Sequence, residues 1–244
     1  MSVSTTSHFL DCDEIHRVWD HSIPPRLEIE SGASVTFRTR NVGDGSLTPQ
    51  STAEDVRNRK FIGHPLTGPV AIKGARAGDV LQIEILELQP DDWGLTLIAP
   101  GRGLLPEDFP EPYLKIWDLS DGDAAELRRG IRVPLEPFHG VMGLAPAEPG
   151  QHSTMPPRRM GGNMDIKQLT VGSTLWLPIE VDGGLFSCGD GHAAQGDGEV
   201  CITAIETAMT STLRFTLCRD FSLNGPEFQL AGPLTPRKIG RAHV

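Results

Sequence analysis

Short apolar runs, each closed by glycine or proline, recur along the whole chain, and this pattern restricts the fold more than any other feature. The run 80–88 is the clearest example, because it follows a Gly-Asp turn and its side chains alternate between two faces. The face of Leu81, Ile83 and Ile85 is the more apolar and is predicted to be buried. Glu87 lies on that same face.

Glycine and proline are over-represented, with 27 Gly and 20 Pro among 244 residues, against about one residue in eight in an average protein. In helix interiors they cost about 1 and 3 kcal/mol, which disfavours an all-helical protein. The apolar share of 38% disfavours a disordered chain, and no apolar stretch reaches the roughly 20 residues that span a bilayer. The sequence therefore predicts a mainly β protein of two packed sheets, similar to a β-sandwich, with one or two short helices.

The other candidate strands are recognised by the same apolar runs. They cover residues 27–29, 35–39, 70–73, 114–119, 131–134, 174–181, 200–206 and 212–218. Ser51 and Glu54 have the spacing of a capping box, which predicts a short helix over about residues 52–60. No composition shift or linker marks a second domain, so residues 1–244 are expected to form a single domain with a flexible tail from about residue 236.

The charge balance and the cysteines exclude several functions. The net charge is −10 and the basic residues are scattered, so neither nucleic acid nor a membrane is expected as a partner. The four cysteines form no C-x-x-C pair, which disfavours a cysteine zinc site. Cys188, Cys201 and Cys218 lie in apolar, strand-like surroundings and are expected to be buried. No secretory signal opens the chain, so a cytoplasmic location is expected.

Polar residues that could carry chemistry are concentrated in residues 188–199, where four glycines separate acidic, amide and histidine side chains. Asp190 and His192 are two residues apart. In an extended segment both side chains point to the same side, which suits two ligands of one metal ion. The alternative is a surface turn that happens to carry a histidine.

Two further segments are candidates for the same site. Asn163 and Asp165 follow a pair of glycines and either share a site or form an Asx turn. Pro65 holds His64 in an extended conformation, and a purely structural histidine is the alternative. The chain contains no G-x-S-x-G elbow, no phosphate-binding loop and no H-E-x-x-H helix. A hydrolase of this sequence would therefore use carboxylates, histidine and a metal ion.

Taken together, these segments resemble the acetamidase/formamidase family. The most specific matches are GGNMD at 161–165 and DGHAAQGDGE at 190–199, with HPLTGPV upstream at 64–70. The resemblance runs in collinear order from about residue 19 to 218. It implies a β-sandwich-like fold, the hydrolysis of a short aliphatic amide such as formamide or acetamide to ammonia and a carboxylate, and a homodimer or larger homo-oligomer.

The resemblance also suggests a metal site. Asp165 is expected to join Asp190 and His192 as the third ligand of a divalent ion, with zinc as the first choice because a catalytic zinc has three protein ligands and an open position. The carboxylates in this set leave Ca²⁺, Mg²⁺ and Mn²⁺ as alternatives.

The remaining polar residues receive roles around this ion. Glu199 is the expected general base, and then the acid that protonates the leaving amine. Glu206 is the alternative base, because a carboxylate in an apolar strand needs a partner. His64 is expected to be either a further ligand or a donor to the tetrahedral oxyanion, and Asn163 and Gln195 are expected to bind the substrate amide.

Two other functions stay open at this point. One is a metal-binding but catalytically silent member of the family that acts as a small-molecule binding protein. The other is a hydrolase of a larger substrate with a C–N bond, because a shared fold fixes the type of reaction better than the substrate.

Overall fold

A computed structural model describes residues 6–231 and 237–238 of the chain. The predicted flexible tail from about residue 236 lies outside these residues, except for the short strand at 237–238. In the described part, strands dominate and one short helix is present, which confirms the predicted mainly β fold. No helix there is long and apolar enough to cross a bilayer.

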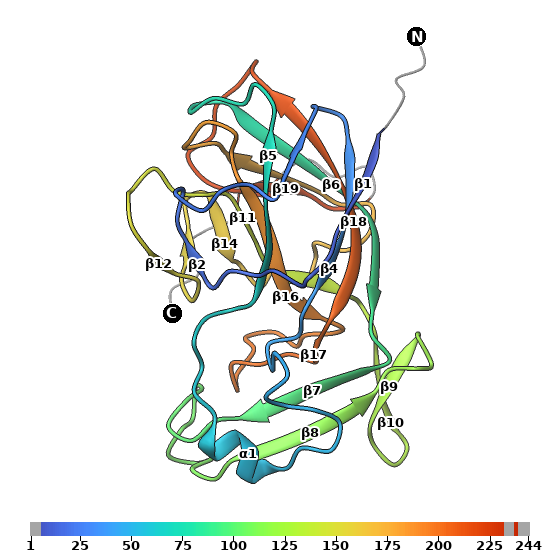
Figure 1. Cartoon of the computed structure of the whole chain (residues 1–244). Coiled ribbons are helices and arrows are strands. Elements are labelled where there is room, and N and C mark those ends of the chain that lie inside the picture. The colour runs from blue at the N-terminus through green and yellow to red at the C-terminus, as the bar shows by residue number, and fades with distance from the viewer. Residues whose placement is uncertain (1–5, 232–236, 239–244) are drawn as a thin grey trace.

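Two large sheets contain most of the strands (Figure 1). In hydrogen-bonded order, the seven-stranded sheet consists of β1 (Ser7–Leu10), β4 (Ser34–Thr39), β18 (Met209–Cys218), β6 (Val80–Pro90), β15 (Thr174–Pro178), β19 (Glu227–Gln229) and β20 (Arg237–Lys238). The nine-stranded sheet consists of β13 (Pro157–Arg158), β14 (Gly161–Asn163), β11 (Phe138–Gly143), β16 (Phe186–His192), β17 (Glu206–Thr207), β7 (Trp93–Ile98) and β8 (Tyr113–Asp118), with β5 (Leu66–Ile72) on β16 and β3 (Leu27–Ile29) on β5.

Three smaller elements complete the fold. They are the hairpin of β9 (Ala124–Arg128) and β10 (Ile131–Pro134), the pair of β2 (Val18–Trp19) and β12 (His152–Ser153), and the helix α1 (Ala53–Asn58). The helix begins one residue later than the predicted capping box. The carboxylate of Asp55 accepts a hydrogen bond from the backbone N–H of Thr52 at 2.7 Å, so Thr52 and Asp55 take the places expected for Ser51 and Glu54.

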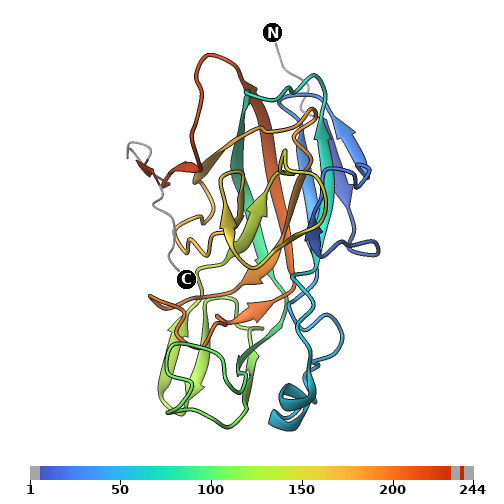
Figure 2. The ribbon, with the colours of Figure 1, turned by 90° about the vertical axis from the view of Figure 1, so that its left-hand side faces the viewer.

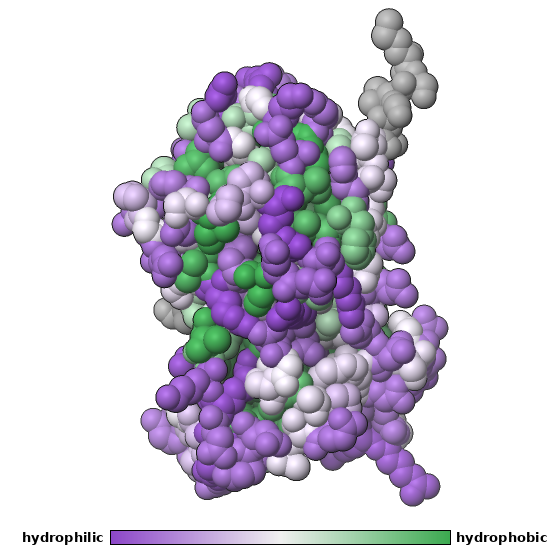
Figure 3. All heavy atoms as spheres, in the orientation of Figure 1, coloured by the Kyte–Doolittle hydropathy of each residue, from purple (hydrophilic) through white to green (hydrophobic). Residues whose placement is uncertain are grey.

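The core lies between the two large sheets. Phe37 on β4 and Phe215 on β18 both contact Phe186 on β16, with ring centroids 5.7 and 4.9 Å apart. All three rings are fully buried, and burying one such side chain stabilises the fold by about 1.5–3 kcal/mol. Figure 2, turned by 90°, shows the same large upper part and the smaller lower end that contains α1, β7 and β8. On the face drawn in Figure 3, hydrophobic groups gather over the upper part, and the lower end is mainly hydrophilic.

Strand β6 confirms the predicted buried face only up to Ile85. Beyond it, Glu87 is exposed and Leu88 is buried, the reverse of a strict alternation. The pairing with β18 shifts register here, because Thr212 pairs with Glu87 while Leu213 pairs with Ile85. The extra residue between these pairs is a β-bulge, which moves the following side chains to the opposite faces of the sheet.

The predicted strand over 200–206 is wrong. Only Glu206 and Thr207 are paired as β17, and the preceding residues form a loop in which Val200 and Ile202 are exposed. Ile202 has a φ of 62°, which is incompatible with an extended strand. Cys201 in this loop is half-buried, as is Cys218, so of the three cysteines expected to be buried only Cys188 is.

Candidate active site

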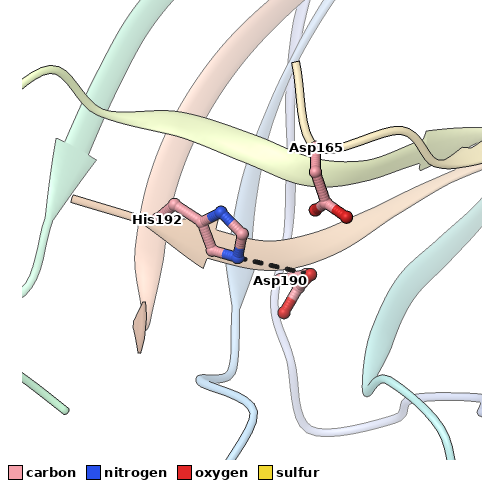
Figure 4. A group of neighbouring side chains, drawn as sticks. All are labelled: Asp165, Asp190 and His192. Carbon is pink, nitrogen blue, oxygen red and sulfur yellow. Dashed lines mark ion pairs between the residues drawn. The ribbon is translucent and has the colours of Figure 1, made fainter. Parts of the chain in front are cut away.

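The structure brings together the three side chains that the sequence suggests as metal ligands. Asp190 and His192 lie at the end of β16, and Asp165 lies in the loop after β14. Their side chains converge on one point (Figure 4). One ligand atom from each lies within 4.8 Å of the others, and His192 Nε2 is 3.4 Å from Asp190 Oδ2.

A glycine makes room for this convergence. Gly140 on β11 lies opposite Asp190, between the register pairs of His139 with Gly191 and Val141 with Gly189. A Cβ atom on Gly140 would lie 2.6 Å from Asp190 Oδ2 and 2.7 Å from Asp165 Oδ1. The Gly140 carbonyl also accepts hydrogen bonds from the N–H groups of Met164 and Asp165. The absence of a side chain at Gly140 is therefore required for the carboxylates to meet.

The backbone is left-handed at three acidic residues of this site. Asp165, Asp190 and Glu199 have φ values of 49°, 56° and 42°. For residues other than glycine this conformation costs about 1–3 kcal/mol each, and it persists only where the surroundings impose it. The left-handed turns direct carboxylates from separate segments toward one point.

Glu206 also belongs to the cluster. It pairs with His192 in the register of β16 and β17, which places both side chains on one face. Glu206 Oε2 lies 3.3 Å from His192 Nε2, and Glu206 Oε1 accepts a hydrogen bond from the Ala204 N–H at 2.9 Å. Glu199 is half-buried, and its carboxyl group makes no hydrogen bond to any residue in the described part of the chain, although its backbone carbonyl accepts from the Ile202 N–H at 2.7 Å. Glu206 is thus held in place, and Glu199 is the less restrained carboxyl.

Gln195 sets the orientation of His192. Its amide N–H donates to the Asp165 carbonyl at 3.1 Å, so its amide oxygen faces His192 Nδ1 at 2.9 Å. In the neutral ring Nδ1 therefore carries the proton, and the lone pair of Nε2 points toward Asp190 and Glu206. Ligating histidines in metal sites are commonly held by such a bond. These two contacts use one hydrogen and one lone pair of the Gln195 amide, and its role in substrate binding stays a prediction.

Asn163 lies close to the cluster in sequence, but its amide group is directed elsewhere. Its Nδ2 donates to the carbonyl of Met155 at 3.0 Å. Its Oδ1 is buried and has no hydrogen-bond partner among the residues that the structure describes. This oxygen and the second hydrogen of Nδ2 remain available for the predicted role in substrate binding.

Burial and mutual repulsion set the pKa values of the carboxyls. Burial, followed by the charge of Asp190, raises the pKa of Asp165 to about 7. Burial, followed by the charges of Asp165 and Glu206, raises the pKa of Glu199 to about 9. Burial also raises the pKa of Glu206. At neutral pH the metal-free cluster therefore retains protons that a bound cation would displace.

Asp190 and His192 shift in the opposite sense, as an ion pair does. Burial alone would raise the pKa of Asp190, but the nearby His64 and His192 outweigh it and lower this pKa. Burial alone would lower the pKa of His192, but the carboxylates of Glu206 and Asp190 outweigh it and raise this pKa well above its ordinary value.

The donor atoms of the cluster fit a divalent metal ion. Asp165 Oδ1, His192 Nε2 and Glu206 Oε2 are buried and have no hydrogen-bond partner within residues 6–231 and 237–238. Leaving such atoms unsatisfied is costly, and one nitrogen with carboxylate oxygens is a ligand set that zinc accepts. Four carboxyls surround one histidine, so the site has an excess of negative charge once the carboxyls lose the protons that they retain in the metal-free protein.

His64 reaches the cluster from the segment before β5. Its ring is buried, and Nε2 lies 3.8 Å from Asp190 Oδ2, beyond hydrogen-bond distance. A Cβ atom on Gly189 would lie 2.5 Å from the carbonyl oxygen of Pro65. The lack of a side chain at Gly189 thus lets the segment with His64 pack directly against β16.

No sequence motif singles out His139, which lies behind the site. It is fully buried, its Nδ1–H donates to the Gly189 carbonyl at 3.1 Å, and its Nε2 accepts from the Ser211 hydroxyl at 2.8 Å. Burial lowers the pKa of His139 to about 4, so the ring is neutral at pH 7. These bonds connect β16, one residue before Asp190, to the opposite sheet. The local sequence offers no signal for them, because Ser211 is 72 positions away.

Replacing Ser211 by alanine is expected to lower the free energy of unfolding by about 1–3 kcal/mol, because the buried Nε2 of His139 loses its donor. Urea denaturation measures this loss. Thr216→Ala on the same strand is the matched control, since the Thr216 hydroxyl makes no hydrogen bond to the described residues. Equal losses in the two variants would contradict the proposed importance of the bond.

Comparisons with known proteins agree on one family. A family model described as acetamidase/formamidase matches residues 2–153 and 149–238. A formamidase from Methylophilus methylotrophus is 28% identical over 91% of this chain and 69% of its own length. The crystal structure of an acetamidase from Bacillus halodurans matches with a TM-score of 0.85 and 34% identity, over 91% of this chain and 74% of that one. A γ-lactamase structure from Delftia acidovorans matches with a TM-score of 0.85 and 28% identity, over 94% and 73%.

Proposed function

The chain belongs to the acetamidase/formamidase family, and on this basis we propose that it hydrolyses the C–N bond of a short aliphatic amide, of the formamide or acetamide type, to ammonia and a carboxylate. The observation that carries the proposal is the presence of three buried ligand atoms without a hydrogen-bond partner, Asp165 Oδ1, His192 Nε2 and Glu206 Oε2, in two potential ligand groups that share His192. An arrangement with so many desolvated acceptors is costly unless it binds a cation.

Asp165, Asp190 and His192 would hold a divalent ion, with zinc as our first choice and Ca²⁺, Mg²⁺ or Mn²⁺ as the alternatives. Glu206 supports this set, because its free oxygen faces the same nitrogen of His192. When bound, such an ion polarises an amide carbonyl and lowers the pKa of a water molecule toward neutrality.

Glu199 is our choice for the proton transfers. As the least restrained carboxyl of the cluster, it can take a proton from the attacking water and deliver it to the leaving nitrogen, which departs only when protonated. Its pKa of about 9 results from burial and from the charges of Asp165 and Glu206. A cation that neutralised those charges would lower this pKa toward neutrality, where Glu199 could both accept and release a proton.

The direct test follows ammonia release from formamide, acetamide and propionamide, with and without a chelator, together with the metal content of the purified protein. Ammonia release that stops with chelator and returns with zinc supports the proposal. Protein with neither metal nor ammonia release would refute it. Bound metal without turnover would favour a silent binding protein.

The γ-lactamase among the structural matches suggests a second candidate, a hydrolase of a cyclic amide. Opening a lactam ring releases no ammonia, so this reaction is followed by NMR of the ring-opened amino acid. Turnover of a γ-lactam without turnover of any open-chain amide would replace the first candidate by the second.

Zinc is expected to raise the melting temperature more at about pH 8 than at about pH 5, because zinc and protons compete for the same carboxylates. In the metal-free protein, the pKa of Asp165 is raised to about 7 and that of Glu199 to about 9. These two groups therefore stabilise the fold at pH values below the ordinary carboxyl pKa. This stabilisation is lost as the pH rises through the two folded-state values. The lowered pKa of Asp190 acts in the opposite sense and stabilises the fold except in strong acid. Differential scanning fluorimetry at several pH values measures the zinc effect; an effect independent of pH would contradict the assignment.

Three further expectations remain predictions. They are the cytoplasmic location, the homodimer or larger homo-oligomer, and the single domain over residues 1–244.

A further inference from the structure

A single buried hydroxyl group contacts His64 twice. Thr154 follows β12, and its Oγ1 lies 3.0 Å from both the backbone N and the ring Nδ1 of His64. Thr154 is 0% exposed and His64 is 6% exposed, so bulk water does not compete for these contacts. The hydrogen bonds of this hydroxyl therefore determine where the His64 ring can carry its proton.

The backbone N–H of His64 can only donate, so Thr154 Oγ1 accepts from it. The hydroxyl hydrogen of Thr154 then needs an acceptor, and within the described part of the chain the only one in contact is His64 Nδ1. If Nδ1 carried the proton instead, this buried hydroxyl hydrogen would have no partner. In the neutral ring, the arrangement that satisfies every group leaves Nδ1 bare and puts the proton on Nε2.

This Nε2–H is directed toward the carboxylate cluster but makes no hydrogen bond to it. The distance of 3.8 Å to Asp190 Oδ2 is too long for a hydrogen bond. The ring is kept in this pose by Phe61, whose ring meets it edge-on with centroids 5.0 Å apart. The preceding backbone is also confined, because a Cβ atom on Gly63 would lie 2.5 Å from the carbonyl oxygen of Arg17.

The two histidines beside Asp190 are thus held in opposite tautomers. Gln195 accepts from Nδ1 of His192 and leaves a lone pair on its Nε2. Thr154 donates to Nδ1 of His64 and leaves a proton on its Nε2. One ring is prepared to bind a cation, and the other is prepared to donate to an oxygen atom.

We propose that Thr154 is a positioning residue that fixes the Nε2–H tautomer of His64, so that His64 donates a hydrogen bond to the carbonyl oxygen of the substrate and is not a metal ligand. The role toward the substrate rests on the proposed amide hydrolysis, whereas the tautomer does not. As negative charge develops on the carbonyl oxygen, a fixed N–H donor stabilises it more strongly than it stabilises the neutral amide.

The tautomer is measured by long-range ¹H–¹⁵N NMR of the full chain labelled with [¹⁵N]histidine, without metal or amide, at a pH where histidine rings are neutral. The His64 signals are assigned by their loss in His64→Gln. We expect an unprotonated Nδ1 and a protonated Nε2 for His64. Thr154→Ser is expected to keep this pattern, and Thr154→Val to lose it. A protonated Nδ1 in the wild type would overturn the proposal, whether or not any amide is hydrolysed.

Zinc stoichiometry and kinetics then test the role of His64. His64→Gln is expected to bind zinc with the wild-type stoichiometry, whereas a ligand substitution would reduce it. Thr154→Val is expected to lower kcat by about 100-fold, the typical effect of losing an oxyanion donor, with a smaller change in KM. Loss of zinc in His64→Gln would overturn the proposal. If the wild type has the expected tautomer but hydrolyses no amide, the proposed function fails and the positioning by Thr154 stands.

Discussion

Replacing Gly140 by alanine is expected to abolish zinc binding and to lower amide hydrolysis by about 100-fold or more. The new methyl group would lie 2.6 Å from Asp190 Oδ2, 2.7 Å from Asp165 Oδ1 and 3.0 Å from His192 Cε1. Strand β11 is paired with β14 on one side and β16 on the other, so its backbone cannot move away. The side chains must separate instead, and a displacement of about 1 Å in such a site costs about 100-fold in rate.

Gly196→Ala is the matched control, because a Cβ atom there meets nothing within 4 Å and the residue lies in the loop after β16, the strand that carries Asp190 and His192. It should retain wild-type zinc affinity and kcat. Calorimetric titration with zinc, ammonia release and circular dichroism separate loss of the site from loss of the fold. Full zinc stoichiometry and turnover in Gly140→Ala would show that the carboxylates do not act together.

The second large effect is expected at the two glutamates, and it should differ between them. Glu199→Gln is expected to lower kcat by about 100- to 10,000-fold, the usual contribution of a general base, while zinc stays bound. Glu206→Gln is expected to weaken zinc binding first, because Glu206 is held between the Ala204 N–H and His192 Nε2. Loss of activity in Glu206→Gln can then be recovered at high zinc concentration, whereas that of Glu199→Gln cannot.

Zinc titrations with ammonia release as the readout distinguish the two roles. The opposite pattern would make Glu206 the base: Glu199→Gln would lose zinc, and Glu206→Gln would have a lowered kcat that high zinc concentration does not restore. Asp197→Asn is the control, since Asp197 is exposed in the same loop as Glu199 and, among the described residues, forms an ion pair only with Lys167.

The sequence predicts those features of this protein that depend on neighbouring residues. The alternation in 80–85 defines a buried face, and the spacing of Asp190 and His192 places both side chains together at one end of β16. The apolar residues Val200 and Ile202 predict a strand over 200–206, yet residues 200–205 form a loop in which both are exposed. The apolar character of Ile202 does not reveal that its backbone is left-handed.

The parts of the site that the sequence could not predict depend on contacts between distant residues. His64 and Thr154 are 90 positions apart, and His139 and Ser211 are 72 positions apart. Gly140 matters only because β11 is adjacent to β16 in the sheet. No local pattern of residue types encodes such pairs, so they become visible only once the topology is known.

Three of the six non-glycine residues with positive φ in the described chain, Asp165, Asp190 and Glu199, carry carboxyls of the site. Glycine or asparagine in place of Asp165 or Glu199 would relax the backbone and remove a carboxyl that burial and neighbouring charges disfavour, whereas Asp190 stabilises the fold through its pairing with His192. A mutant library selected for heat resistance alone should therefore accumulate such substitutions here and lose its chemistry while its melting temperature rises. Selection that retains turnover should instead find its stabilising changes in the exposed loops, far from the carboxylates.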